Sequence, residues 1–242
     1  MAVSSKGEGP MTKTYKKPDV SVDVVLLTLA EPGLMVALHR RPGEPYAGAL
    51  ALPGGYIHAD EDASLEDAAR RTLREKTGLA PRYLEQLQTF AGPERDPRGW
   101  SVAISYVALV PFEELASVRG GVFEFYSVDA IPELAFDHSE QVRAAVLRVR
   151  NKSSYSTLPC WLLPEKFTLT QLQHTYEGVF GEAVTRATFR SRLGIKVGDV
   201  KAGEAVDEAG VLIATDDYQV GNQRPARLFR ADKLGLFKRA SW

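Results

Sequence analysis

Residues 54–79 of the chain, GGYIHADEDASLEDAARRTLREKTGL, join a glycine turn to a single amphipathic helix. Ser64 and Asp67 have the spacing of an N-terminal capping box, and Gly78 stands where a helix commonly ends in a left-handed residue. We therefore predict a helix over about residues 64–77. Which chemistry this helix supports depends on the side chains along one of its faces.

The turn and helix resemble the Nudix box, a motif usually written G-x5-E-x7-R-E-U-x-E-E-x-G-U, in which U is aliphatic. Matching positions are occupied by Arg71, Leu73, Glu75, Gly78 and Leu79. Two acids of the motif are missing, because Thr72 and Lys76 stand where the box has glutamates. Five residues separate Gly55 from Glu61, as in the box, but nine residues instead of seven then separate Glu61 from Arg71.

The missing acids bear on metal binding. In the Nudix family, carboxylates at positions i, i+3 and i+4 of this helix hold a divalent cation on one helix face. Magnesium requires hard oxygen ligands. Here the three positions are Thr72, Glu75 and Lys76, so only Glu75 supplies a carboxylate, and the ammonium of Lys76 repels a cation. We therefore predict no metal site, no catalytic residue and no hydrolase activity.

The composition is that of an ordinary globular protein. Of the 242 residues, 44% are hydrophobic and 25% are charged. The single cysteine, Cys160, excludes an internal disulfide, and no apolar run approaches the roughly 18 residues of a membrane span. The net charge is −1, but the part from Lys152 onward is basic by about three. We expect a cytoplasmic protein without a membrane partner.

Apolar runs separated by turn signals predict two domains. We expect strands at about 20–29, 34–40, 83–90 and 102–109, and helices at about 64–77 and 139–149. The proposed boundaries are a flexible leader at 1–17, a first domain at 18–150, a linker at 151–166 and a second domain at 167–242. The linker begins with the polar stretch NKSSYSTL, and its CWLLPEKF stretch can pack as a short apolar connection against either domain. The resemblance to the Nudix family implies that the first domain is an α/β/α sandwich with a mixed sheet, and thus of the α/β class.

The second domain has the order of elements of a winged helix-turn-helix. Thr168 and Gln171 form a capping box, and apolar residues recur at helical spacing until Gly181. A second helix and two short strands are then expected at about 185–193, 211–215 and 227–230. In such a module the second helix enters the major groove of DNA.

A defective Nudix box joined to a winged helix resembles the NrtR family of Nudix-related transcriptional regulators. The same likeness extends to the segments DPRGWSVAISYVAL, LAFDH, FTLTQLQHTYEGVFG and RPARLFR. The resemblance spans nearly the whole chain and implies a homodimeric repressor that binds double-stranded operator DNA. It also implies that the Nudix-like domain senses ADP-ribose or a related nucleotide sugar, and that the regulated genes belong to NAD metabolism.

For the effector pocket we predict nine ligand-binding residues: Arg40, Arg41, Gly55, Glu61, Arg71, Glu75, Lys76, Trp100 and His138. The physical argument concerns charge. A domain that binds a diphosphate without Mg²⁺, and so requires no cofactor, needs another cation in the place of the metal. We hypothesise that Lys76 supplies it together with Arg71 and either Arg40 or Arg41, because ammonium and guanidinium groups both suit phosphate.

Simpler structural roles compete with these assignments. Arg71 has the i, i+4 spacing for an ion pair with Glu75, and Lys76 could be a solvated residue of the helix surface. Trp100 could pack against the protein instead of stacking on a base. His138 has the alternative of a buried structural histidine, and Glu61 that of a loop charge.

For DNA, the predicted contacts are Arg186, Thr188, Arg190 and Arg192 on the second helix, and Arg224 and Arg227 on the hairpin. Arg186 or Arg190 is expected to read a guanine, and Arg192 to touch phosphate. The hairpin arginines flank a loop that would lie along phosphates or in a minor groove.

Two other function classes remain open. The first is a Nudix hydrolase with residual ADP-ribose pyrophosphatase activity through Glu61 and Glu75. The second is a protein-interaction module carried on the C-terminal helices. Salt separates these classes, because DNA binding through phosphates weakens steeply as the salt concentration rises.

Overall fold

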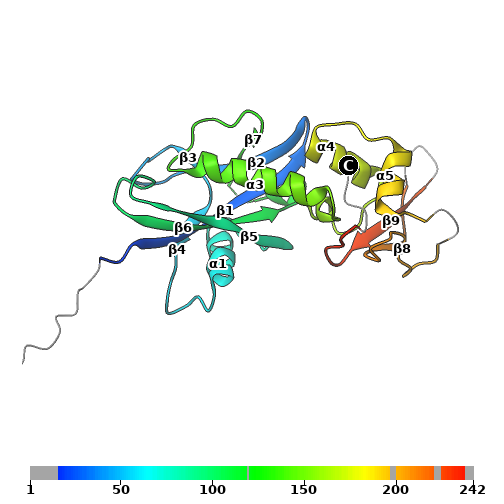
Figure 1. Ribbon diagram of the computed structural model, residues 1–242, viewed down its shortest axis with the longest axis horizontal. Coiled ribbons are helices and arrows are strands. Elements are labelled where there is room, and N and C mark those ends of the chain that lie inside the picture. Colours follow the sequence, from blue (N-terminus) through cyan, green and yellow to red (C-terminus); the bar gives the residue numbers. More distant parts are fainter. Residues whose placement is uncertain (1–15, 119, 197–199, 221–224, 238–242) are drawn as a thin grey trace, which may run out of the picture.

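The chain folds into two domains arranged along its long axis (Figure 1). The computed structural model describes residues 16–118, 120–196, 200–220 and 225–237. The leader predicted at 1–17 therefore falls almost entirely outside the described residues. The first domain contains β1 (Asp19–Ala30), β2 (Gly33–Arg40), β3 (Leu50–Ala51), β4 (Gly54–Tyr56), α1 (Leu65–Thr77), β5 (Tyr83–Gly92), β6 (Ser101–Leu109), α2 (Phe112–Ala116), β7 (Glu124–Ser127) and α3 (His138–Ser153). After the short 3-10 helix η1 (Leu158–Leu162), the second domain contains α4 (Leu169–Phe180), α5 (Arg186–Leu193), β8 (Leu212–Gln219) and β9 (Ala226–Ala231).

The first domain is built on a seven-stranded mixed sheet. The main path of the sheet runs β3-β2-β1-β6-β5, with β4 paired to β1 and β7 paired to β2. β1 and β6 are parallel, whereas the other pairs are antiparallel. Helices α1 and α2 pack on one face and α3 packs on the other. The predicted α/β/α sandwich is thereby confirmed, although the short elements β3, β4, β7 and α2 had not been predicted.

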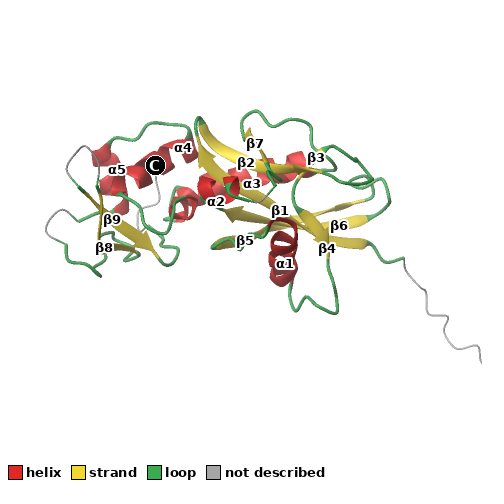
Figure 2. Cartoon of the chain, turned by 180° about the vertical axis from the view of Figure 1, so that it is seen from behind, coloured by secondary structure: helices red, strands yellow, loops and turns green. Residues whose placement is uncertain are grey.

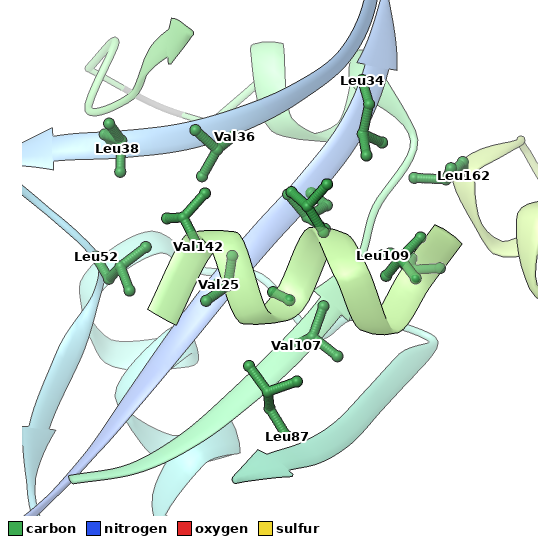
Figure 3. Close-up of a cluster of buried hydrophobic side chains, with 14 of the residues drawn as sticks. Val25, Leu34, Val36, Leu38, Leu52, Leu87, Val107, Leu109, Val142 and Leu162 are labelled. Atoms are coloured by element: carbon green, nitrogen blue, oxygen red, sulfur yellow. The ribbon is translucent and has the colours of Figure 1, made fainter. Parts of the chain in front are cut away.

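The central strand β1 is buried on both faces, which explains its long apolar run. Val22, Val24 and Leu26 pack with α1. Val25 and Leu27 point to the opposite face and pack with α3. Figure 3 shows this second cluster, in which side chains of the sheet meet the apolar face of α3. Because successive side chains of a strand alternate between faces, one apolar strand serves two cores.

The ends of α1 follow the local sequence. Ser64 has an extended backbone, and its hydroxyl accepts a hydrogen bond from the backbone N–H of Asp67 at 3.1 Å. Gly78 adopts φ 74°, a conformation that favours glycine, and its N–H bonds to the carbonyl of Arg74. The predicted beginning and end of this helix are both confirmed.

The second domain has the predicted winged helix-turn-helix. Both halves of the Thr168–Gln171 capping box are formed, and Gly181 ends α4 with φ 74°. Thr185 caps α5 and Gly194 ends it. The strands β8 and β9 form an antiparallel hairpin that is longer than predicted. The two helices and the hairpin share one core, made chiefly of Phe167, Leu172, Tyr176, Phe189, Leu193 and Phe229.

The segment at 151–166, predicted as a linker whose CWLLPEKF stretch can pack as a short apolar connection, is partly helical and partly buried. Helix α3 continues to Ser153, and η1 is buried at Leu158, Pro159, Cys160 and Leu162. Leu158 and Leu162 belong to the core of the first domain, whereas Cys160 belongs to that of the second. The apolar residues of CWLL thus make this segment a packed connection.

The second domain lies at the end of the sheet opposite β3 and β4 (Figure 2). Among the described residues, none of the helices is both long and apolar enough to cross a membrane.

Candidate functional site

A cavity of about 230 Å³ opens at the end of the sheet where β4 pairs with β1. Its walls come from β1, β2, β4, α1, the loop before β6 and the first turn of α3. The lining residues are Asp19, Ser21, Asp23, His39, Arg41, Leu52, Gly54, Gly55, Tyr56, Lys76, Arg95, Asp96, Arg98, Ser101, Phe136 and His138. Charged and aromatic side chains dominate this set, as expected for a site that binds a charged ligand with a planar ring.

The glycine turn that precedes α1 forms one wall because only glycine fits there. A Cβ on Gly54 would lie 2.1 Å from Oδ1 of Asp23 and 2.9 Å from the carbonyl oxygen of Val22. A Cβ on Gly55 would lie 3.2 Å from Oγ1 of Thr72. The turn therefore brings its backbone directly over both β1 and α1. Gly54 had been quoted only as part of the motif, and its close approach to Asp23 was not predicted.

The floor of the cavity is a buried polar network around Asp23. Nε2 of Gln141 donates to Oδ2 of Asp23 at 3.0 Å and to Oδ1 of Asp137 at 2.9 Å. Arg95 forms a two-pronged ion pair with Asp137 at 2.8 and 3.0 Å and lies 3.6 Å from Asp23. The hydrogen bond from Gln141, together with the ion pair, compensates for the burial of these charges.

His138 belongs to this floor and is neutral in character. Its side chain is buried, and burial lowers its pKa below the usual value despite the nearby carboxylate of Asp23. Nδ1 accepts a hydrogen bond from the backbone N–H of Leu52 at 3.0 Å. The proton of the neutral ring therefore sits on Nε2, which faces Asp23 at 3.7 Å. His138 therefore lines the cavity, as predicted for a ligand-binding residue, and it is also the buried structural histidine of the alternative interpretation.

Two cations in the wall, Lys76 and Arg41, have no ion-paired carboxylate in the part of the chain that the structure describes. Lys76 reaches across the turn and donates from Nζ to the carbonyl of Gly54. Arg41 donates from Nε to the carbonyl of Pro45 at 2.7 Å. Within the described residues neither makes an ion pair with a carboxylate, whereas the other two lining arginines do. The positive charges of Lys76 and Arg41 are thus left for an anionic ligand.

The surroundings of these two cations alter their pKa values. Burial is the main cause that lowers the pKa of Lys76 below its usual value, while Asp23 opposes the shift and Arg41 adds to it. Burial and the charge of Arg98 likewise lower the pKa of Arg41. A bound anion would relieve the repulsion between the cations, so an anionic ligand is electrostatically favoured here.

Aromatic rings and guanidinium groups share the rim of the cavity. The guanidinium of Arg41 lies over the ring of Phe136 at 4.7 Å. That of Arg98 lies 5.7 Å from the ring of Tyr56 and 6.0 Å from Phe136, while its charge pairs with Asp96 at 2.6 Å. The rim therefore offers flat apolar faces next to fixed positive charge.

Arg71 does not reach the cavity, contrary to the predicted role in binding a diphosphate. Its guanidinium is buried and donates to both oxygens of Asp62 at 2.7 and 2.9 Å and to the carbonyl of Tyr56 at 2.9 Å. It also contacts Glu75 at 3.2 Å, so the predicted i, i+4 ion pair is present. These bonds occupy the guanidinium and fasten the 57–63 loop to α1, which is a structural role.

Four other predicted ligand residues also lie outside the cavity lining. Arg40 points away and pairs with Glu124 at 2.7 Å. Glu61 contacts only the ring of His58, at 3.3 Å, and Glu75 is held by Arg71. Trp100 is 51% exposed, so its side chain neither packs in a core nor lines the cavity. Of the nine predictions, Arg41, Gly55, Lys76 and His138 are brought together there.

The side chains at the family's metal positions do not form a metal-ligand set. Thr72 is buried beneath Gly55, and among the described residues its hydroxyl has no hydrogen-bond partner. Glu75 is engaged by Arg71, and Lys76 places an ammonium group at the turn. In the described part of the chain, no group of three or more histidine, cysteine or acidic side chains has the geometry to hold an ion. The residues present therefore do not fit Mg²⁺.

A second candidate surface lies on the winged helix. A groove of about 250 Å³ between α4, α5 and β9 is lined by Arg186, Arg190 and Arg227, together with Thr168, Leu169, Thr170, Gln173, Phe189, Ala226 and Phe229. Three of the six predicted DNA contacts thus share one face. Arg227 is braced there by the ring and hydroxyl of Tyr218 and by the carbonyl of Val200.

The remaining predicted DNA contacts have different surroundings. Thr188 is exposed, and its backbone N–H and hydroxyl both bond to the capping residue Thr185. Arg192 is half-buried, and burial lowers its pKa below the usual value; it does not line the groove. Arg224 lies outside the described residues.

Several cavity residues were missed in the sequence. Asp23 carried a usable signal, because an acid within a β-branched strand must be buried with a partner. Arg98 and Phe136 lie in the DPRGW and LAFDH segments, but nothing in the local pattern indicated that these two loops meet. Asp62 was weighed only as a loop charge, although it is the main partner of Arg71.

Comparison with known proteins gives matches over both domains. Residues 17–147 match the family described as NUDIX domain, and residues 159–196 match the NrtR DNA-binding winged helix domain. Over 220 residues the chain is 34% identical to the ADPR responsive transcriptional repressor NtrR of Acinetobacter baylyi, which covers 89% of this chain and 83% of that protein.

Comparison with solved structures also finds NrtR. The crystal structure of Shewanella oneidensis NrtR complexed with a 27mer DNA superposes with a TM-score of 0.76 at 34% identity, over 88% of this chain and 93% of that chain. The NUDIX domain of the same Shewanella protein, complexed with ADP ribose, has a TM-score of 0.50 at 37% identity, over 55% of this chain and 90% of that chain.

Proposed function

Because the chain belongs to the NrtR family of Nudix-related transcriptional regulators, we propose that it is a transcriptional repressor whose DNA binding responds to ADP-ribose. The winged helix binds double-stranded operator DNA, and the cavity in the Nudix domain binds the effector. One relative, Shewanella oneidensis NrtR, has been solved with DNA, and its NUDIX domain has been solved with ADP ribose. As a bacterial-type regulator it acts in the cytoplasm, and the controlled genes belong to NAD metabolism.

The observation that carries the proposed mode of binding is the pair of cations Lys76 and Arg41, which form no ion pair with a carboxylate among the described residues. In a Nudix hydrolase a metal ion offsets the charge of the diphosphate. Here an ammonium group projects from the helix position where the family has a metal-binding glutamate, and it bonds to the glycine turn. We propose that Lys76 and Arg41 replace the metal and hold the diphosphate without a cofactor.

The same geometry disfavours the alternative of a residual ADP-ribose pyrophosphatase. That activity would need Glu61 and Glu75 to share a displaced metal, but Glu75 is held by Arg71 and Glu61 faces His58. We therefore propose a sensor without hydrolase activity. Release of AMP from ADP-ribose in the presence of Mg²⁺, abolished by Glu75→Gln, would overturn this part of the proposal.

For DNA recognition we propose that Arg186 and Arg190 enter the major groove with α5, while Arg227 contacts the backbone from the hairpin. Their shared groove face supports this arrangement. A homodimer would present two such faces to half-sites about one helical turn apart. The protein-interaction alternative predicts no binding to DNA and no dependence on salt.

The proposal is tested with DNA that the wild-type protein selects from a random double-stranded pool. We expect ADP-ribose to change the affinity for the selected DNA and to raise the melting temperature of the protein, because a ligand of the native state stabilises it. AMP and ribose 5-phosphate serve as controls that lack the diphosphate bridge. Equal DNA affinity with and without ADP-ribose would remove ADP-ribose as the effector.

A further inference from the structure

The winged helix is fastened to the first domain by the C-terminal end of α4, whereas residues at the start of the same helix line the DNA groove. Gly178 stands inside this helix, where glycine is unfavourable. A Cβ there would lie 2.6 Å from Cδ1 of Leu29 at the end of β1, so an added methyl group would force this side chain to move. The next residue, Val179, is buried within the hydrophobic core of the first domain. Helix α4 therefore packs directly on the sheet.

Arg150 fixes this contact from the other side. It belongs to the last part of α3, and its Nε donates to the carbonyl oxygen of Val179 at 3.1 Å. Carbonyls in the last turn of a helix lack a partner within the helix, so the bond satisfies one of them. The same guanidinium contacts Asp129 at 3.1 Å. One side chain thus joins three segments at the junction of the two domains.

Helix α3 connects this junction to the cavity. His138 in its first turn lines the cavity, and Asp137 just before it pairs with Arg95 of the cavity wall. Arg150 lies about 18 Å away along the same helix. Val142, Ala145, Val146 and Val149 pack the helix onto the sheet between these ends. A shift or tilt of the helix at one end is therefore carried to the other.

We propose that Arg150 and Gly178 are positioning residues that set the orientation of the winged helix according to the occupancy of the cavity. This proposal rests on the proposed function. A ligand seated against His138 contacts the first turn of α3, and α3 transmits its position to α4 through the bond from Arg150 to Val179. The effector acts only if it binds the two orientations with different affinity.

The test uses the full chain with Arg150→Gln and the matched control Arg143→Gln. Arg143 lies on the exposed side of the same helix, so the control removes the same charge without touching α4. Three quantities are measured: the Kd for ADP-ribose by calorimetry, the Kd for DNA selected by the wild type, and the ratio of DNA affinities without and with ADP-ribose. Allosteric coupling of ordinary strength gives a wild-type ratio of about 5 to 150.

We expect the Kd of Arg150→Gln for ADP-ribose to lie within about twofold of the wild-type value. The ratio of its DNA affinities without and with ADP-ribose should fall toward one, and by about fivefold or more if the wild-type ratio is at least that large. Arg143→Gln should keep the wild-type ratio. Gly178→Ala is the second variant, since it disturbs the same junction through Leu29 without removing a charge, and it should also lower the ratio. Arg150→Lys retains one hydrogen-bond donor for the carbonyl of Val179, so it should keep part of the wild-type ratio that Arg150→Gln loses.

Two results would overturn the proposal. The first is that Arg150→Gln and Gly178→Ala both keep the wild-type ratio of DNA affinities without and with ADP-ribose. The other is a DNA affinity that falls equally with and without ADP-ribose, which would mark a purely structural role. A wild-type protein that ignores ADP-ribose would instead show that the proposed function has failed, and this outcome is recognised in the wild-type arm alone.

Discussion

Replacing Lys76 by glutamine tests the idea that a side chain has taken the place of the metal. The change removes the ammonium group that bonds to the carbonyl of Gly54 and lines the cavity, and it keeps a polar side chain of similar reach. If the ammonium neutralises a diphosphate, the affinity for ADP-ribose must fall. Arg41 remains in the wall, so binding should weaken without disappearing.

The expected magnitude follows from the strength and exposure of the contact. A hydrogen bond to a charged group contributes about 1.5–3 kcal/mol. Although its ammonium group is partly desolvated against the glycine turn, Lys76 as a residue is exposed, which places its contribution near the lower value. A loss of about 1.5 kcal/mol corresponds to a roughly tenfold rise in the Kd.

Titration calorimetry with ADP-ribose, in Mg²⁺ and in a chelator, measures the effect. The matched control is Arg74→Gln, which removes a positive charge from the exposed face of the same helix, outside the cavity lining. We expect wild-type binding to be indifferent to Mg²⁺ and the control to bind like the wild type. Strict dependence on Mg²⁺, or an unchanged Kd in Lys76→Gln, would refute the reasoning.

Three further predictions concern the rest of the molecule. Gly54→Ala should lower the melting temperature and destabilise the fold by about 1–3 kcal/mol, as overpacking does, because the added Cβ overlaps Asp23; a melting temperature equal to that of the wild type would contradict this. The hydrogen bonds from Arg71 lower the pKa of Asp62 from 3.8 to about 2, so the stability that this pair contributes should be full above about pH 4 and should be lost as the pH falls toward 2. Chemical denaturation from pH 7 to pH 2 should show this loss in the wild type but not in Arg71→Gln. Arg227→Gln should lower the slope of log affinity for DNA against log salt by about 0.9, because this residue is proposed to contact the DNA backbone, and an unchanged slope would contradict that contact.

The elements that could be predicted are those whose limits are set by neighbouring residues. Ser64 and Gly78 limit α1, and Thr168 and Gly181 limit α4, because capping and left-handed glycines act within a few residues. The connection at 151–166 could not be predicted in this way. The sequence suggested a linker with a short apolar stretch that packs against either domain, but which core receives Leu158 and which receives Cys160 depends on the two separate cores that they join.

Two of the four predicted residues that line the cavity, Gly55 and Lys76, come from the Nudix motif itself. Lys76 and Gly55 are adjacent to the cavity because the turn folds over the helix that follows it. Arg71 belongs to the same motif, but a nearby acid, Asp62, neutralises its charge. The identity of a cation therefore did not reveal whether it was available to a ligand, since that depends on which partner the fold brings to it.

The sequence by itself determined that a Nudix-type helix had lost two acids and that a winged helix followed it. Both conclusions rest on residue types at fixed spacing, because helix caps and motif positions depend on residues that are close together in the sequence. Only the tertiary structure decided that Arg41, and not Arg40 or Arg71, stands with Lys76 in the cavity wall. It also decided that Arg150 connects α3 to α4. These contacts join segments far apart in the chain, so their formation depends on how the sheet and helices pack together and not on any local pattern.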